Sequence, residues 1–311
     1  MILKLIRQPQ FIIGLLFILS LLVFSFTWPN VLEVDKAESL EKIDFLYDDD
    51  GNITAFIPFS PSQVPPFGTD LYGKQLFYQI IDGAKYTILI AVGIAFFRIF
   101  ISVGIVLINP KSNFTFLNDI VQATLYIPTT ILAYLFLTSL TMRLNFAPMS
   151  SMKLIMIQCL ILIGIGVPPL VSTFTKEIKT ILNKDYIINT FAMGSGKTYV
   201  YYKHVLPELL TKLTLLFAQQ MIQTLILLAH LGVLAIFIGG SETLVLGDHL
   251  DPILVIIPLA GEWAGIIGTS YTKLQAAPWI ILIPLAFFAV TILALNLIIN
   301  GIKNYADIYK S

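Results

Sequence analysis

A five-residue segment in the second half of the chain carries the residue types of a phosphate-binding loop. Gly194–Thr198 reads Gly-Ser-Gly-Lys-Thr. A P-loop needs Gly-x4-Gly-Lys-Ser/Thr between a β-strand and a helix, so that backbone N–H groups and the lysine hold phosphates. Here Phe191 stands where the first glycine should be, and no strand pattern precedes it. We therefore predict that this segment binds no nucleotide and that its glycines separate two helices.

Other residues with catalytic or metal-binding chemistry are scattered. The three histidines are His204, His230 and His249. They show no metal spacing, and solvated loops are the preferred interpretation both for His249 with Asp248 and Asp251 and for the acidic run 48–52, which lacks EF-hand spacing. Cys159, the single cysteine, excludes an intrachain disulfide. With no Gly-x-Ser-x-Gly elbow either, we expect neither an enzyme nor a cofactor bound by this chain.

Polar residues inside apolar runs are the remaining candidates. Gln219, Gln223 and His230 recur at i, i+4 and i+11, so a helix places them on one face. Polar groups in hydrocarbon are costly unless they face a bundle or water. They form either a translocation path for a peptide-like solute or a set of interhelical hydrogen bonds, worth about 0.6 kcal/mol each. Both interpretations stay open for the glutamines, whereas a structural role is preferred for His230.

Arg98 lies centrally in another apolar run. Its insertion costs roughly 2.5 kcal/mol or more, so it must meet a carboxylate, carbonyl groups or water. We expect an ion pair within a subunit interface first and a contact with substrate on the translocation path second.

Composition predicts the elements that hold these residues. The chain has 311 residues, of which 57% are apolar and 12% charged, against about 25% charged in soluble domains. The apolar residues gather in runs of about twenty, the length of a transmembrane helix. We therefore predict an all-α membrane protein with about six spans, at 11–28, 86–108, 120–140, 154–174, 213–238 and 278–299. Pro252–Gly268, which is shorter and contains Pro258, Gly261 and Glu262, is expected to form a re-entrant or surface helix.

Lysine and arginine predict the orientation. Lys4 and Arg7 precede the first span, and segment 175–212 carries six lysines. Because such residues collect on the cytoplasmic side, we expect a protein of the cell membrane with both termini and segment 175–212 in the cytoplasm. The predicted organisation is an N-terminal helix (1–29), an external acidic loop, flexible or lightly folded (30–85), and a five-helix core (86–311). The net charge of zero excludes a basic nucleic-acid-binding surface.

The cytoplasmic stretch 185–207 has a mixed composition. It is too polar to cross a bilayer, yet it holds too many large apolar residues for a free loop. A short helix that lies outside the membrane and packs into a partner's groove satisfies both facts.

Four segments together resemble the oligopeptide/dipeptide/nickel class of ABC importer permeases. Gly68-Thr69-Asp70, followed by Gly83-Ala84-Lys85, is similar to the motif that ends the family's long first external loop. Asp119 with Ile127-Pro128 is similar to the family's third span, and Glu262-Trp263 begins a segment that resembles its closing span. Gly194 with Leu206-Pro207 resembles the cytoplasmic EAA loop, which docks onto an ATPase.

The resemblance implies a type I importer fold and a function. The chain would be a non-hydrolysing permease subunit that forms half of a path for peptides or similar solutes, with nickel or metal chelates as the alternative cargo. Its partners would be a second permease, two cytoplasmic ATPases that hold ATP and Mg, an extracellular solute-binding protein and the lipid bilayer. The implied ATPase-docking residues are Asp185, Tyr186, Ile187, Ile188, Phe191, Met193, Gly194, Leu206 and Pro207.

The docking loop departs from the family pattern at the Glu-Ala-Ala sequence from which the EAA loop takes its name. Ile188-Asn189-Thr190 replaces Glu-Ala-Ala. This removes the glutamate that would make a charge contact with an ATPase, but leaves the shape of the helix intact. A hypothesis from a different class, an intramembrane enzyme or sensor using the polar residues of the fifth span, would require paired catalytic groups, which we do not find.

Overall fold

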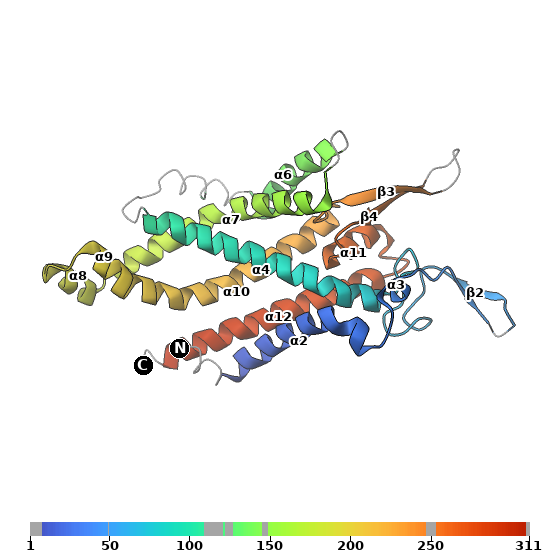
Figure 1. Cartoon of the computed structure of the whole chain (residues 1–311), viewed down its shortest axis with the longest axis horizontal. Coiled ribbons are helices and arrows are strands. Elements are labelled where there is room, and N and C mark those ends of the chain that lie inside the picture. Colours follow the sequence, from blue (N-terminus) through green and yellow to red (C-terminus); the bar gives the residue numbers. More distant parts are fainter. Residues whose placement is uncertain are drawn as a thin grey trace.

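The structure, a computed structural model, describes residues 8–48, 50–108, 121, 127–144, 149–246 and 253–308. Long helices run roughly along one axis, and two β-hairpins project from one end (Figure 1). In the described part, five helices are long and apolar enough to cross a membrane, which confirms the predicted class. They are α2 (Pro9–Val31), α4 (Leu76–Ile108), α7 (Ser151–Leu182), α10 (Leu206–Val233) and α12 (Trp279–Ile308).

The third predicted span, 120–140, is described only in part. Its described helix, α6 (Thr129–Leu144), has 16 residues, fewer than the roughly 20 that cross a bilayer. Apart from Val121, positions 109–126 lie outside the described residues. Pro128 stands just before the first turn of α6, where the missing N–H of proline costs nothing.

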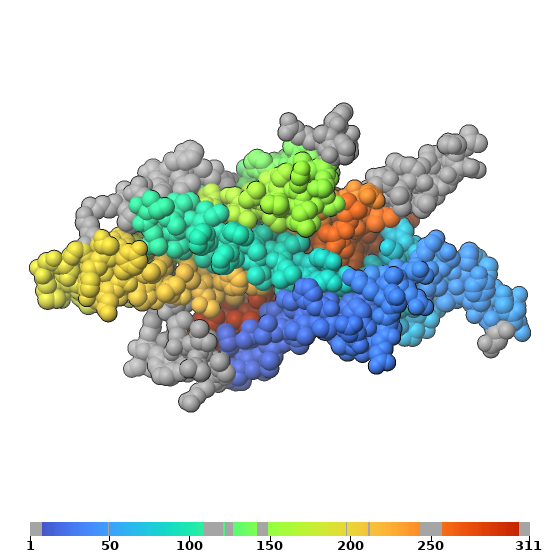
Figure 2. All heavy atoms as spheres, viewed as in Figure 1, coloured from blue at the N-terminus to red at the C-terminus, as the bar shows by residue number. Residues whose placement is uncertain are grey.

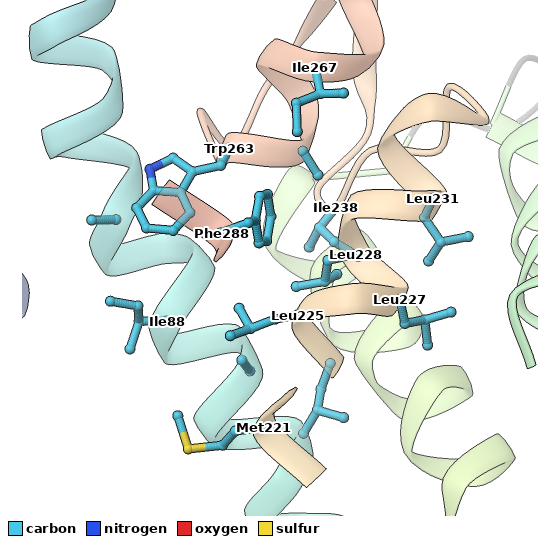
Figure 3. Packing of buried hydrophobic residues seen from close by; sticks show 14 of the residues in the cluster. Ile88, Met221, Leu225, Leu227, Leu228, Leu231, Ile238, Trp263, Ile267 and Phe288 are labelled. Atoms are coloured by element: carbon cyan, nitrogen blue, oxygen red, sulfur yellow. The ribbon is translucent and has the colours of Figure 1, made fainter. Parts of the chain in front are cut away.

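The long helices pack as neighbours that are distant in sequence. α2 lies along α12, α4 lies along α7, and α10 contacts α4 and α12. Trp263 is buried where these helices meet, beside Phe288, Leu225 and Ile88 (Figure 3). Its indole Nε1 donates to the carbonyl oxygen of Ile80 at 2.8 Å, so the largest side chain of this core has its only polar atom satisfied.

The fifth helix ends earlier than predicted, at Val233 rather than near 238. Beyond it Ala235 adopts a φ of +56°, a conformation that ends a helix. Gly232 is needed at this end because a Cβ there would lie 2.3 Å from the carbonyl oxygen of Ala264. The close backbone contact fixes the next short helix, α11 (Trp263–Ser270), against α10.

The stretch Pro252–Gly268 is not one helix, contrary to the prediction. Its first half is strand β4 (Ile253–Pro258), which pairs antiparallel with β3 (Ser241–Leu246); only its second half enters α11. The β-branched run Ile253–Ile257 favours a strand. The short 3-10 helix η2 (Tyr271–Lys273) follows α11.

The acidic loop after α2 is more folded than predicted. It contains α3 (Lys36–Ser39) and a hairpin of β1 (Phe45–Tyr47) and β2 (Ile53–Phe56). Gly51 turns the chain at the tip with a φ of +81°. Asp-Gly between two short runs rich in aromatic and β-branched residues is a hairpin signal, and it was present in the sequence.

The opposite end of the molecule is formed by the lysine-rich segment. It contains α8 (Asp185–Ala192), α9 (Lys197–Val200) and the π-helix η1 (Tyr201–Val205), which runs directly into α10. The beginning of α2 and the end of α12 lie toward the same end as α8 (Figure 1). We refer to these as the α8 end and, for the end with both β-hairpins, the hairpin end.

Candidate functional site

Helix α8 is the predicted short helix outside the spans. It follows α7 after two residues and protrudes beyond the long helices (yellow in Figure 2). Gly194 N–H donates to the carbonyl oxygen of Phe191 at 3.0 Å, and Gly194 has a φ of +85°. A left-handed glycine just past the last turn is a standard helix C-cap, so the predicted role of Gly194 as the break after this helix is confirmed.

The same geometry bears on the resemblance to a P-loop. Gly194 follows helix α8, whereas the phosphate-binding motif follows a strand. The strand–loop–helix arrangement that aims backbone N–H groups at phosphates is therefore missing at this segment.

The side chains of α8 divide into a buried and an exposed set. Ile187 is fully buried among Ile178 and Ile181 of α7 and Val205 of η1, so it anchors the helix to its own chain and is not accessible to a partner. Tyr186, Ile188 and Met193 are 46%, 51% and 79% exposed. The exposed members define an apolar surface, which we call the α8 surface.

The other candidates border this surface. Asp185 is exposed at the first turn of α8, and Phe191 is half-buried. Leu206 is half-buried and Pro207 is exposed in the first turn of α10. Pro207 has no backbone N–H to donate, and the irregular turn η1 directly precedes it.

Two tyrosines that the sequence did not single out extend the α8 surface. Tyr199 and Tyr202 are 54% and 71% exposed. The ring of His204 lies between those of Tyr186 and Tyr199, at centroid distances of 5.8 and 6.0 Å. His204 therefore links α8 to α9, and the π-helix that carries it is an irregularity often found at functional sites.

Glu208 fastens α8 to the start of α10. Lys184 Nζ forms an ion pair with Glu208 Oε1, and Tyr186 Oη donates to Glu208 Oε2 at 3.1 Å. Although burial alone would raise it, hydrogen bonds from Lys184 and Tyr186 hold the pKa of Glu208 below its ordinary value. A second ion pair, Lys212 with Glu177, joins α10 to α7. Sequence reasoning missed both pairs because their members are 24 and 35 residues apart.

Arg98 lies inside the bundle, with 3% of its surface exposed. Its Nε and Nη2 donate to the carbonyl oxygen of Leu162, at 3.1 and 2.7 Å. Nη1 donates to Gln220 Oε1 at 3.3 Å and Thr224 Oγ1 at 3.4 Å. Gly166 provides the space for this side chain, because a Cβ at position 166 would lie 2.2 Å from Arg98 Nε.

The first expectation for Arg98, an ion pair in a subunit interface, is therefore corrected. In the part of the chain that the structure describes, Arg98 donates to neutral oxygens of α7 and α10, and its side chain is enclosed by its own subunit. Gln220 and Thr224, one helical turn apart on α10, are the residues that sequence reasoning missed. The sequence signal for them was the i, i+4 spacing of Gln220 and Thr224, directly beside the predicted Gln219.

The three predicted residues of α10 do not act as one cluster. Gln219 is half-buried, whereas Gln223 and His230 are exposed. Gln220 Nε2 donates to Gln223 Oε1 at 2.9 Å, so a hydrogen-bonded chain runs from Arg98 to the surface of α10. His230 Nδ1 lies 3.2 Å from Thr130 Oγ1 of α6, which agrees with a structural role.

The Gly-Thr-Asp segment joins elements at the hairpin end. Thr69 Oγ1 accepts from Phe59 N at 2.9 Å, and its carbonyl oxygen accepts from Trp279 Nε1 at 3.2 Å. Asp70, 7% exposed, accepts from the backbone N–H of Lys74 and from Gln79 Nε2, at 2.8 and 2.9 Å. The motif is thus a structural joint between the acidic loop, α4 and α12.

Comparison with known proteins bears on the family resemblance predicted from the sequence motifs. No protein-family model matches the chain. The chain is 24% identical over 308 residues to the di/tripeptide transport system permease protein DppC of Pseudomonas aeruginosa (strain UCBPP-PA14), an alignment that covers 94% of this chain and 86% of that protein. The resemblance predicted from the motifs is thereby confirmed: over nearly its whole length the chain is similar to a permease of a di/tripeptide transport system.

Proposed function

We propose that the chain is the membrane-spanning permease subunit of an ATP-driven importer and forms half of a translocation path for peptides or similar small solutes. The observation that carries the proposal is α8, a capped helix outside the spans that is anchored to its own chain by Ile187 and exposes Tyr186, Ile188 and Met193. Such a surface fits a groove in a partner. The relation to a permease of a di/tripeptide transport system supports peptides as cargo.

The α8 surface receives a cytoplasmic ATPase subunit in this proposal. Two such subunits hold ATP and Mg and supply the energy, a second permease completes the path, and an extracellular solute-binding protein delivers the solute. This chain itself hydrolyses nothing. Because Ile188-Asn189-Thr190 replaces Glu-Ala-Ala, apolar burial rather than a glutamate contact holds the ATPase.

Charge supports the orientation. At the α8 end Lys176, Lys179 and Lys203 are exposed, and cytoplasmic segments next to spans are rich in such residues. The hairpin end carries the acidic loop. We therefore place the α8 end and both termini in the cytoplasm and the hairpins outside the cell membrane.

The exposed amide of Gln223 is our candidate contact on the path. It is held by Gln220, which in turn binds Arg98. An amide oriented in this way can hydrogen-bond the backbone of a peptide, and Arg98 acts by positioning it. Gln219 beside it and His230 farther along α10 complete the polar groups of this helix that we assign to the path.

Purification and reconstitution test the proposal. The tagged chain would be produced with the second permease and the two ATPases proposed as its partners, purified in mild detergent and placed in liposomes. We expect the ATPases to elute with the chain and the liposomes to accumulate a radiolabelled dipeptide or tripeptide when ATP, Mg and the solute-binding protein are present. If the chain purifies without ATPase subunits although all its proposed partners are produced with it, the proposed function is contradicted.

A further inference from the structure

One face of the β1–β2 hairpin exposes a row of large apolar side chains. Phe45 pairs with Phe56, and Tyr47 pairs with Ile53 beyond an irregularity in the register between Leu46 and Tyr47. The rings of Phe45 and Tyr47 lie 6.3 Å apart on one side of the hairpin, and the cross-strand partners Phe56 and Ile53 lie beside them on that face. Phe45, Phe56, Tyr47 and Ile53 are 40%, 68%, 61% and 48% exposed, respectively. Phe45 also meets Phe56 edge-on at a centroid distance of 5.7 Å. We call this set the hairpin face.

Among the described residues, the backbone contacts that attach the hairpin to the rest of the chain lie near its base. Ile43 N–H donates to the carbonyl oxygen of Gly73 at 3.0 Å, and Lys42 forms a β-bridge with Lys74. An isolated two-stranded hairpin is marginally stable in water. Exposed apolar patches beyond the usual scattered residues mark interaction sites, so a covering partner accounts for the hairpin face.

The surroundings of the hairpin favour a protein over a lipid surface. The hairpin points away from the helix bundle along its long axis (Figures 1 and 2). Among the described residues between 33 and 50, seven are acidic and two are lysines. Anionic lipid headgroups attract basic segments, so this charge opposes membrane binding and is complementary to a basic rim on a partner.

The hairpin also stands beside an opening in the permease. A cavity of about 260 Å³ lies at this end, next to the Gly-Thr-Asp segment. Its polar lining includes Asp70, Lys74, Gln79, Asp82 and Thr269. Leu40, between α3 and β1, contributes to the same wall, so a protein seated on the hairpin would lie next to the cavity.

We propose that the hairpin face, Phe45, Tyr47, Ile53 and Phe56, is the docking surface for the extracellular solute-binding protein. The contact surface of that partner is an apolar groove rimmed by lysine and arginine. This inference rests on the proposed function and deepens it, because it assigns the acidic loop a partner and a mode of contact.

The test uses the complete transporter in lipid nanodiscs with the purified, peptide-loaded solute-binding protein of the same system. In the variant Tyr47→Ser/Phe56→Ser, the concentration of binding protein that half-maximally stimulates ATP hydrolysis should rise about tenfold or more, as for loss of hot-spot anchors. The rate without binding protein should stay unchanged. The control Tyr271→Ser/Leu274→Ser, which alters exposed side chains that do not belong to the hairpin, should behave as the wild type.

A second variant separates contact from folding of the hairpin. Leu46 and Ala55 are partners across the strands on the opposite face, so cysteines there lie close enough to form a disulfide. The oxidised Leu46→Cys/Ala55→Cys protein should retain wild-type stimulation and should lose it when Tyr47→Ser and Phe56→Ser are added. Wild-type stimulation in the locked, serine-containing protein would overturn the inference.

A photoreactive amino acid at position 56 identifies what covers the face. Crosslinking to the solute-binding protein supports the inference, and crosslinking to lipid overturns it. A wild-type transporter that no binding protein stimulates would count against the proposed function itself. If the binding protein stimulates the wild type and the double serine variant equally, only the assignment of the hairpin face as a docking surface is contradicted, and the proposed function stands.

Discussion

The two ends of the molecule both expose apolar side chains outside the spans, but they hold them differently. At the α8 end the exposed residues belong to a helix fixed by a buried isoleucine and by Glu208, which ties it to α10. At the hairpin end they belong to a two-stranded sheet attached near its base. The first arrangement couples the exposed residues to a long helix of the bundle, whereas the second leaves them joined to the bundle through few contacts.

The charges around the two surfaces also differ. Exposed lysines surround the α8 surface, and acidic residues surround the hairpin face. Since complementary charge selects partners and speeds their encounter, we expect the two surfaces to select different partners. In the proposed function, this difference suits the α8 surface to transmitting force and the hairpin face to capturing a diffusing protein.

The largest effect is expected in a test of sidedness. Cysteines at Ala37 and Ala192, both exposed and located at opposite ends, should react with a membrane-impermeant maleimide from opposite sides, Ala37→Cys from outside. Cys159, which lies in α7, would be replaced by alanine first. Complete labelling of both positions from the same side would end the comparison between a cytoplasmic and an external surface.

Gly194→Val should cause the next largest effect, on the α8 end alone. A Cβ at Gly194 meets no atom within 4 Å, but the φ of +85° is strained for any β-branched residue, by roughly 1–2 kcal/mol. The C-cap should open and tilt the α8 surface, which should lower co-purification of the ATPases more than tenfold, as expected when apolar anchors worth about 2 kcal/mol leave their groove.

Gly196→Val is the matched control for this prediction. Its added Cβ also meets nothing within 4 Å, but Gly196 does not have a left-handed backbone. The control should keep the ATPases and dipeptide uptake. Equal loss in both variants would show that the segment tolerates no side chain at all, and the C-cap explanation would be wrong.

Two adjacent isoleucines should separate anchoring from docking. Ile187→Ala removes a fully buried side chain and should destabilise the packing of α8 by about 2–4 kcal/mol, seen as faster hydrogen exchange of its amides. Ile188→Ala, at an exposed position, should leave exchange unchanged and weaken ATPase binding severalfold. The opposite pattern would mean that the α8 surface faces its own chain.

Periodicity and composition predicted the parts of the fold that depend on local patterns. The long apolar runs became the five long helices, and the mixed stretch after 184 became α8, because its length and polarity excluded a span. The β1–β2 hairpin was not predicted because its acidic turn is also typical of a solvated loop. Asp50-Gly51 between two strand-like runs was the signal that favours a hairpin.

The partners of Arg98 could not be predicted from spacing. They depend on how α4, α7 and α10 rotate against one another, and Gln219 and Gln220 are equally polar in the sequence. Rotation placed Gln220 and Thr224 inward and Gln223 outward, and Gly166 provided the space. Likewise, only the fold brings Lys184 to Glu208, so the fastening of α8 to α10 was invisible in the sequence.

The smallest expected effect concerns that ion pair. Lys184 and Glu208 are partly exposed, so solvent screening limits the pair to about 0.5 kcal/mol. Glu208 has a lowered pKa in the folded protein; its contribution is therefore present above the ordinary glutamate pKa and is lost as the pH falls through the folded value. A fluorophore on Met193→Cys, in a protein with Cys159→Ala, should report α8 loosening by roughly twofold in population between pH 7 and pH 3, a range that extends below the ordinary glutamate pKa. In Glu208→Gln it should report the looser state at both values. A wild-type signal that is flat across this range, or a pH response that survives Glu208→Gln, would show that the stability of the α8 end comes from its apolar anchor alone.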